Sequence, residues 1–126
     1  MRVFKNLFGK GNKIHSDEIY LNRVDTLSTP LQITSTVYTN PNVVTLKEPY
    51  TQSRIYLVEF YIEDARNSQF AMFTGLDGGS SGFLIVGSYG GATYSISKIK
   101  SENNIGFYSV SGGTQPVFVN AIYAIG

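Results

Sequence analysis

The chain has 126 residues, a length typical of one domain with a single hydrophobic core. Only 15% of its residues are charged and 13% are aromatic, and ten basic residues against nine acidic ones give a net charge of +1. This balance disfavours nucleic acid and anionic membranes as partners, and the lack of cysteine with a single histidine excludes disulfides, thiolate zinc sites and multi-histidine metal cages. We therefore expect no metal ion and no cofactor.

Residues 1–14 differ in charge from the rest of the chain. They contain four basic residues and no acidic one, whereas residues 15–126 hold the other six basic and all nine acidic residues. The apolar side chains of this segment fall on one side of a short helix: Val3, Phe4, Leu7 and Phe8. The pattern predicts an N-terminal arm or linker, either docked on a partner or frayed, before one domain over residues 15–126. No apolar run is long enough for a signal peptide or a membrane span, so neither is expected.

The first part of the domain predicts short extended segments. Residues 17–24 are ambiguous between a helical turn and a strand. Residues 31–39 alternate apolar and polar side chains as a strand does. Asn40-Pro41-Asn42 then predicts a turn into a further strand over residues 43–48.

The longest strand pattern covers residues 54–63 and is largely apolar on both faces. One face carries the side chains of Tyr56, Val58, Phe60 and Ile62, and the other those of Ile55, Leu57, Glu59 and Tyr61. Such a strand is central in its sheet, and its second face needs cover from another layer or another subunit. We therefore expect Ile55, Leu57 and Tyr61 at an oligomer interface.

Five further strands are predicted over residues 69–74, 83–89, 92–99, 105–110 and 117–125. Glycine or asparagine pairs separate most of them and are expected to supply the positive φ angles of tight hairpins, so that the five strands form a meander. The whole pattern predicts an all-β fold, a β-sandwich or jelly roll of about eight or nine mostly antiparallel strands. A barrel such as the OB-fold needs fewer strands.

The C-terminal sequence Ala121-Ile122-Tyr123-Ala124-Ile125-Gly126 is apolar to within one residue of its end. We expect it to be tied into a sheet, with the apolar edge covered by a neighbouring subunit. This adds Ile122, Tyr123 and Ile125 to the predicted oligomer interface.

Catalytic chemistry has few candidates. His15 lies in the basic segment before the first strand, and no serine stands in a Gly-x-Ser-x-Gly turn. Glu59 interrupts an otherwise apolar strand, which suits either a general acid in a cleft or a carboxylate paired with Arg54, Arg66 or a neighbouring subunit. The second interpretation is favoured, so no catalytic residue is assigned and the protein is expected not to be an enzyme.

Residues 75–82 form a glycine-rich stretch without the features of a phosphate-binding or calcium-binding loop. We interpret it as a long hairpin loop whose Asp77 and Ser80 offer polar groups of the kind found on glycan-binding rims. Tyr50, Tyr89 and Tyr94 flank predicted turns, where an exposed ring stacks on a sugar face or fills a protein pocket. The competing interpretation is that these rings pack against the domain and reach water with their hydroxyls.

The segment Ile105-Gly106-Phe107-Tyr108, the Gly-Gly hairpin after it and the Ala-Ile-Tyr-Ala-Ile-Gly ending resemble the distal domains of bacteriophage and prophage tail-fibre and baseplate proteins. The approach over residues 9–20 is similar to that of phage structural proteins, and together the two segments cover about half of the chain. The resemblance implies a β-sandwich head, usually trimeric, that binds saccharides or proteins of the host surface through variable loops. It transfers no binding residue.

From these observations we expect a non-enzymatic virion protein: a tail-fibre tip, baseplate or decoration subunit. The resemblance implies a homotrimer that binds a cell-surface glycan or another virion protein, contacts other virion proteins through residues 1–14, and occurs in the virion or, before assembly, in the bacterial cytoplasm. The alternatives are a small carbohydrate-active enzyme using Glu59 or Glu63 as its acid, and a lectin-like module unrelated to phages.

Overall fold

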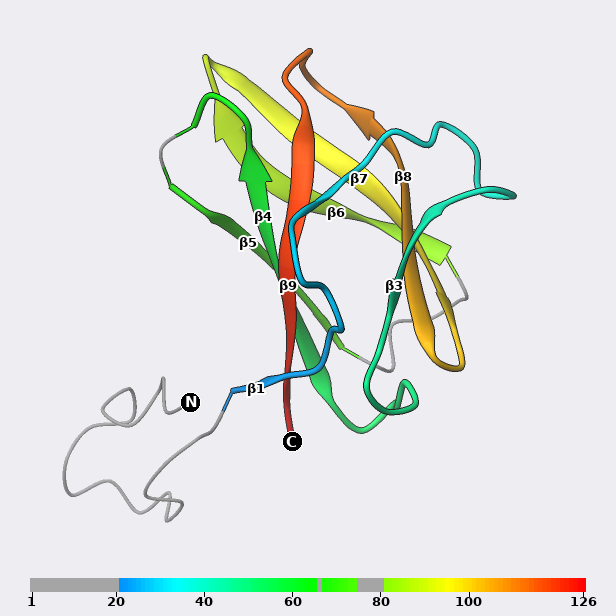
Figure 1. The fold of residues 1–126 in the computed structure, drawn as a ribbon. Coiled ribbons are helices and arrows are strands. Elements are labelled where there is room, and N and C mark those ends of the chain that lie inside the picture. Colours follow the sequence, from blue (N-terminus) through cyan, green and yellow to red (C-terminus); the bar gives the residue numbers. More distant parts are fainter. Residues whose placement is uncertain (1–20, 66, 75–80) are drawn as a thin grey trace, which may run out of the picture.

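The structure of the chain is a computed structural model that describes residues 21–65, 67–74 and 81–126. Over these residues it is all-β without a helix, and nine strands form two antiparallel sheets that face each other as a β-sandwich (Figure 1). The predicted fold class is confirmed. No helix of the described residues has the length and apolar character needed to cross a membrane.

The first sheet has the strand order β1-β9-β4-β5, with β2 pairing with β9 farther along its length. Its strands are β1 (Asn22–Arg23), β2 (Leu31–Gln32), β9 (Val117–Ile125), β4 (Ile55–Ile62) and β5 (Gln69–Thr74). In Figure 1 β9 runs beside β4, with the N-terminal strand β1 on its other side.

The second sheet has the order β3-β8-β7-β6 and lies behind the first in Figure 1. Its strands are β3 (Asn42–Thr45), β8 (Asn104–Ser111), β7 (Ala92–Ser101) and β6 (Ser81–Tyr89). The edge strands β5 and β6 are consecutive in the sequence, and each pairs within its own sheet with one neighbour, β4 or β7.

The core lies between the sheets because each long strand sends alternate apolar side chains inward. Phe60 of β4 and Phe107 of β8 meet edge to face, with ring centroids 5.7 Å apart and planes at 84°, and both are fully buried. Burial of each such ring contributes on the order of 1.5–3 kcal/mol to the free energy of unfolding.

The expected five-strand meander is wrong. Of the five strands predicted for the meander, β6, β7 and β8 are sequential neighbours in one sheet, whereas β5 and β9 belong to the other sheet. The strands themselves are confirmed, with β5 and β9 at the predicted bounds. Because β9 buries Val117 and Val119 against the core while pairing on both sides, it lies between β4 and the N-terminal strands instead of continuing from β8.

The predicted strand over residues 31–39 is also shorter than expected, since only Leu31–Gln32 pairs with β9. The side-chain oxygen of Asn42 accepts hydrogen bonds from the backbone amides of Thr34 and Ser35, both at 2.8 Å. An asparagine that binds nearby amides offers the backbone an alternative to a sheet ladder. The alternating pattern therefore ends in a loop, which returns through Pro41 to β3.

A β-bulge in β9 reverses the direction of its side chains. The register with β4 shifts between Glu59 and Phe60, so that one residue of β9 is left over. Val119 points inward before the bulge and Ile122 points inward after it, both with no exposed surface. The expectation of Ile122 at an oligomer interface is therefore wrong.

The turns agree only in part with the expected glycine geometry. Gly90 and Gly91 have φ of 63° and 81° and join β6 to β7. Gly112 has φ of 101°, and a Cβ there would lie 1.9 Å from the carbonyl oxygen of Thr93. Among the described residues the one non-glycine residue with positive φ is Ser109, at 57°, so the Asn103-Asn104 turn forms without the predicted positive φ.

The predictions for the N-terminal part of the chain fall wholly or partly outside the described residues. The N-terminal segment 1–14 lies there completely. Of the ambiguous residues 17–24, the structure describes 21–24, where Asn22–Arg23 forms strand β1.

Candidate functional site

The outer face of the first sheet is apolar over β9, β4 and β5. The burial patterns of the three strands place one set of side chains outward. We call this set the apolar face: Phe118, Tyr123 and Ile125 of β9, Ile55, Leu57, Glu59 and Tyr61 of β4, and Phe70 and Met72 of β5. Phe70 and Met72 are 52% and 65% exposed, so large apolar groups reach solvent here.

This face contains five of the six residues predicted for an oligomer interface. Ile55, Leu57 and Tyr61 point outward from β4, and Tyr123 and Ile125 lie opposite β4 on β9. Tyr123 is directly opposite Leu57, and Ile125 is opposite Ile55. The predicted central position of β4, with two apolar faces, is thus what the sheet shows.

One carboxylate lies within the apolar face. Burial raises the pKa of the Tyr123 phenol above its ordinary value, and the negative charge and hydrogen-bond acceptance of Glu59 raise it further. Glu59 therefore interacts with a tyrosine of the neighbouring strand. The expected partner Arg54 forms an ion pair with Glu48 instead, and Arg66 lies outside the described residues.

The edge of the first sheet is secured by the buried carboxylate of Asp25. It accepts hydrogen bonds from the amides of Ile122 at 2.8 Å and Leu27 at 2.9 Å and from the guanidinium Nε of Arg23 at 2.9 Å. Burial alone would raise the pKa of Asp25, but these hydrogen bonds from Arg23, Ile122 and Leu27 outweigh it and hold the pKa below its ordinary value. Asp25 also forms an isolated bridge with Leu46, just beyond β3 of the second sheet.

The outer face of the second sheet has a different chemistry. We call its hydroxyl-bearing and amide-bearing residues the serine-rich face: Ser95, Ser97 and Ser101 of β7, and Asn104, Tyr108 and Ser111 of β8. The hydroxyls of Ser95 and Ser111 lie 2.8 Å apart, which is a hydrogen bond between the strands. Apolar side chains occur at the β6 edge of this sheet, where Phe83 and Ile85 are exposed.

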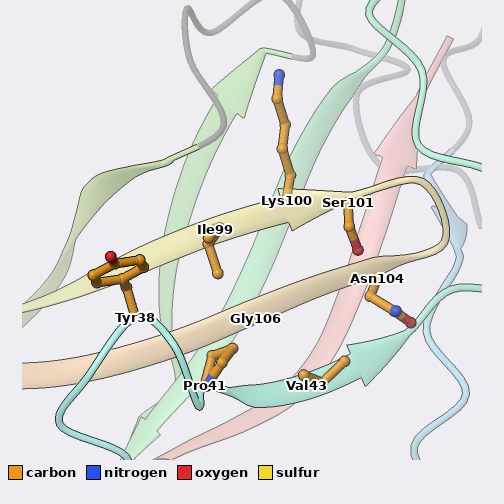
Figure 2. Close-up of a pocket in the computed structure, with 8 residues that line it drawn as sticks. All are labelled: Tyr38, Pro41, Val43, Ile99, Lys100, Ser101, Asn104 and Gly106. Carbon is orange, nitrogen blue, oxygen red and sulfur yellow. The ribbon is translucent and has the colours of Figure 1, made fainter.

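A depression of about 230 Å³ lies at the β3 side of the serine-rich face (Figure 2). Its lining comes from the loop before β3 and from strands β3, β7 and β8: Tyr38, Pro41, Val43, Ile99, Lys100, Ser101, Asn104 and Gly106. Figure 2 shows the side chain of Lys100 projecting away from the other lining residues. Its ammonium lies 4.8 Å from the ring centroid of Tyr50, a cation–π distance.

The loop that carries Tyr38 is held in place from both ends. Gly106 makes room for Pro41, because a Cβ at Gly106 would lie 2.8 Å from the Pro41 ring. The amide of Ser109, at its positive φ, donates a hydrogen bond of 2.7 Å to the carbonyl of Ser35. The loop conformation is thus fixed by a glycine and an unusual backbone angle in β8.

Tyr50 has neighbours that a free stacking platform would lack. Its ring stacks on Tyr56 at 4.7 Å between centroids, and Phe73 stacks with both. With the ammonium of Lys100 over it, the ring belongs to an aromatic cluster at one end of the sandwich. The packing interpretation therefore describes Tyr50 better than the sugar-stacking one.

The remaining predicted binding residues are scattered or lie outside the described residues. Tyr94 is 2% exposed, and its hydroxyl accepts a hydrogen bond from the amide of Gln115 at 3.1 Å, so the expected exposed ring is wrong. Its direction follows from β7, whose even-numbered residues point inward. Tyr89 is half-buried against the core. Asp77 and Ser80 lie outside the described residues.

Three exposed residues of the two outer faces are not predicted from the sequence. Tyr38, at 63% exposed, belongs to the predicted strand over residues 31–39, although its position just before Asn40-Pro41 is a signal for a turn. Phe70 and Met72 alternate with the buried residues of β5, and the sequence prediction does not say which face of the sheet they occupy. The signal for an exposed apolar face is that β5, like β4, carries apolar side chains at both its odd-numbered and its even-numbered positions.

A buried lysine was also missed. Lys98 points into the core from β7 with no exposed surface, and its ammonium lies 4.6 Å from the ring centroid of Phe73.

The described residues hold no group of three or more histidine, cysteine, aspartate or glutamate side chains placed to bind a metal ion. Comparison with known proteins adds no relative: no protein-family model, curated protein or solved structure matches the chain.

Proposed function

We propose that the protein is a non-enzymatic structural or attachment subunit that associates with further copies of itself through the apolar face. The observation that carries the proposal is the outward row of large apolar side chains across β9, β4 and β5. The assignment to a virion, and a trimer as the symmetry, rest on the resemblance of the C-terminal half to phage tail-fibre and baseplate domains.

The composition of the apolar face supports association with a protein surface. Two phenylalanines, two tyrosines and a methionine are among its members, together with a single carboxylate. Aromatic residues and methionine are enriched in protein interfaces, whereas charged residues are depleted from interface centres. The described part of the chain adds no third layer of strands over this face.

The size of the face favours a second copy as its occupant. With strands spaced about 4.8 Å apart and a rise of about 3.3 Å per residue, β9, β4 and β5, which have 9, 8 and 6 residues, project an area of roughly 360 Å². The accessible area is larger because the side chains stand up from the sheet. Each partner contributes roughly 800 Å² to a stable interface, so the apolar face is large enough to form the centre of such a contact.

The electrostatics of the face also allow two copies to meet. Glu59 is its acidic residue, and Arg23 lies on β1 opposite Tyr123, with nearly half of its side chain exposed. In a cyclic trimer each copy contacts the next one around the axis, so Glu59 of one copy can face Arg23 of its neighbour. Such rim pairs favour the correct register more than they add affinity.

The test is the solution mass of the full chain and of two lysine variants, measured by light scattering after size exclusion. Met72→Lys places a charge on the apolar face at a side chain that is 65% exposed, so the fold should survive. Ile85→Lys is the matched control, because it adds the same charge to a residue that is 54% exposed on the second sheet. We expect an oligomer for the full chain and for Ile85→Lys, and a monomer for Met72→Lys.

The competing results are equally specific. A monomeric full chain at concentrations up to about 100 μM, where a typical specific homo-oligomer is formed, would overturn the proposal. So would dissociation by Ile85→Lys with Met72→Lys still oligomeric. In a third case the Met72→Lys variant stays oligomeric, but deletion of residues 1–14 gives a monomer. That result would overturn the proposal and assign the contact to the N-terminal segment.

A further inference from the structure

We infer that the depression beside Tyr38 is a binding site for a neutral saccharide. Its features are an exposed aromatic ring, an apolar floor and side-chain hydroxyl and amide groups, in a shallow hollow of about 230 Å³. The site belongs to the second sheet. It therefore goes beyond self-association and does not depend on it.

The aromatic ring provides the stacking surface. Tyr38 is 63% exposed, and Figure 2 shows its ring at one side of the depression, over strand β7. The floor is formed by apolar groups of Pro41, Val43 and Ile99, with Gly106 between them. The faces of a pyranose ring that carry C–H groups pack against such rings and aliphatic groups, whereas a fully hydrated ion does not.

The polar groups at the other side are neutral. Ser101 ends β7 and Asn104 begins β8, and their side chains line the depression opposite Tyr38. A hydroxyl donates one hydrogen bond and accepts up to two, and an amide offers two donors with one acceptor oxygen. These are the groups that match the paired donor and acceptor character of sugar hydroxyls.

The charge around the depression favours a neutral ligand. Lys100 contributes to the lining, but its ammonium lies over the ring of Tyr50, on the side away from the depression. The other lining side chains carry no charge. A nucleic acid or an anionic sugar would need a cation directed into the hollow.

The loop that carries the ring is ordered before any ligand binds. Asn42 accepts hydrogen bonds from two loop amides, and the Ser35 hydroxyl donates one to the carbonyl of Asn40. The close fit of Pro41 against Gly106 fixes the end of the loop beside Tyr38. A preformed site reduces the ordering cost of binding, which matters for the weak affinities of single sugar units.

The size of the depression sets the length of the ligand. Pockets for drug-sized molecules are about 300–1,000 Å³, so 230 Å³ suits one sugar ring, with the rest of an oligosaccharide in solvent. The lectin-like alternative and the attachment function both need such a site. Its residues differ from those first predicted, because Tyr50 and Tyr94 lie elsewhere.

The experiment follows backbone amide chemical shifts by NMR while methyl glycosides are added to the full chain. The probes are the neutral methyl glycosides of glucose, galactose, mannose and N-acetylglucosamine, with that of glucuronic acid as the charged comparison. We expect saturable shifts at Ile99, Ser101, Asn104 and Gly106 with at least one neutral probe, at millimolar concentrations.

Three variants assign the effect to the ring. Tyr38→Ala removes the stacking ring and should weaken binding by at least about tenfold, whereas Tyr38→Phe keeps the ring and should stay within about threefold. Val37→Ala is the matched control, because Val37 is the preceding residue of the same loop, is 49% exposed and does not line the depression. It should bind as the unaltered chain does.

The inference is overturned if none of the four neutral probes produces saturable shifts in the depression. Unchanged binding by Tyr38→Ala, or tighter binding of the glucuronide than of every neutral probe, would also overturn it. The monomeric Met72→Lys variant should keep its sugar affinity. Loss of oligomers with retained sugar binding, or the reverse, therefore separates failure of one proposal from failure of the other.

Discussion

The two outer faces of this sandwich differ although the two inner faces are alike. Both sheets send valine, isoleucine and phenylalanine side chains into one shared core. Outward, β4 and β5 of the first sheet carry leucine, methionine and phenylalanine, whereas β7 of the second sheet carries serines at every second position from Ser95 to Ser101, except for Ile99. Core formation therefore does not explain the apolar outer face.

That difference separates what folding requires from what binding requires. A sheet of a sandwich needs one apolar face, and a solvated outer face of serine and threonine satisfies the alternation. The outer face of the second sheet is polar in this way except in two places. These are the depression beside Tyr38 and the β6 edge, where Phe83 and Ile85 are exposed. The first sheet exceeds the requirement of one apolar face along β9, β4 and β5, and the proposed self-association uses this excess of apolar side chains.

The largest effect is expected when the hydrogen bonds of the Asp25 carboxylate beside β9 are removed. Asp25→Ala should lower the free energy of unfolding by about 3 kcal/mol, because it removes the acceptor of the buried Ile122 amide and of the partly buried Leu27 amide, and an unsatisfied buried group costs about 1–3 kcal/mol. Urea denaturation measures the change. Asp64→Ala removes an exposed carboxylate and is the control, with an expected change within about 0.5 kcal/mol. Equal effects of the two variants would show that Asp25 does not hold the first sheet.

The same carboxylate should make the stability of the sandwich sensitive to acid. Because the folded-state pKa of Asp25 is depressed, its contribution is fully present above the unfolded pKa of about 3.9 and is lost as the pH falls through the lower folded pKa. We expect the stability difference between the unaltered chain and Asp25→Asn to shrink below about pH 4. Urea titrations at pH 7, 4 and 2.5 measure it, and a difference that stays constant would contradict the assignment.

A smaller effect is expected at the second face. Gly106→Ala places a Cβ 2.8 Å from Pro41 and 3.1 Å from Ile99, so the loop must shift. Such overpacking costs about 1–3 kcal/mol, and the displacement of Pro41 should weaken sugar binding without changing the oligomeric state. Ser97→Ala on the same face is the control for stability and mass. Loss of oligomers in Gly106→Ala would mean that the two faces are not independent.

The smallest expected effect concerns the carboxylate in the apolar face. Glu59→Gln removes the negative charge beside Tyr123 and should lower the pKa of that phenol, while burial still keeps it raised. The ultraviolet absorbance of tyrosinate, followed against pH, measures the shift, with Glu102→Gln as a control at an exposed carboxylate. An unchanged titration would place Glu59 away from Tyr123.

The same variant also tests the enzyme alternative. Release of sugar from a glycan by the unaltered chain but not by Glu59→Gln would support it.

The sequence predicted the bounds of the strands better than it predicted which strands pair. Alternation and turn residues locate β5 and β9 because both signals are local. Which strands pair is decided by contacts between distant segments, so the position of β9 between β1 and β4 carried no local signal. The same limit explains the meander that was expected and not found.

The site was less predictable because small local events redirect side chains. One extra residue in β9 turns Ile122 inward and leaves Tyr123 and Ile125 outward. Tyr94 looked like a turn residue but points into the core, and Tyr38 looked like a strand residue but lies in a loop held by Asn42. Bulges and side-chain hydrogen bonds to the backbone leave no periodic trace, so residue type indicated the chemistry of the surfaces but not the residues that carry it.

The position of β9 also has a consequence for synthesis. The carboxylate of Asp25 and the amide of Ile122 that it binds are 97 residues apart in the sequence. During translation the N-terminal strands and β4 lack the strand that joins them until the segment forming β9 has left the ribosome. Domains dominated by such distant pairings fold slowly and expose unpaired strands meanwhile. The pairings of β9 with β1, β2 and β4 can therefore form only late in synthesis, and until then one edge of β4 stays unpaired.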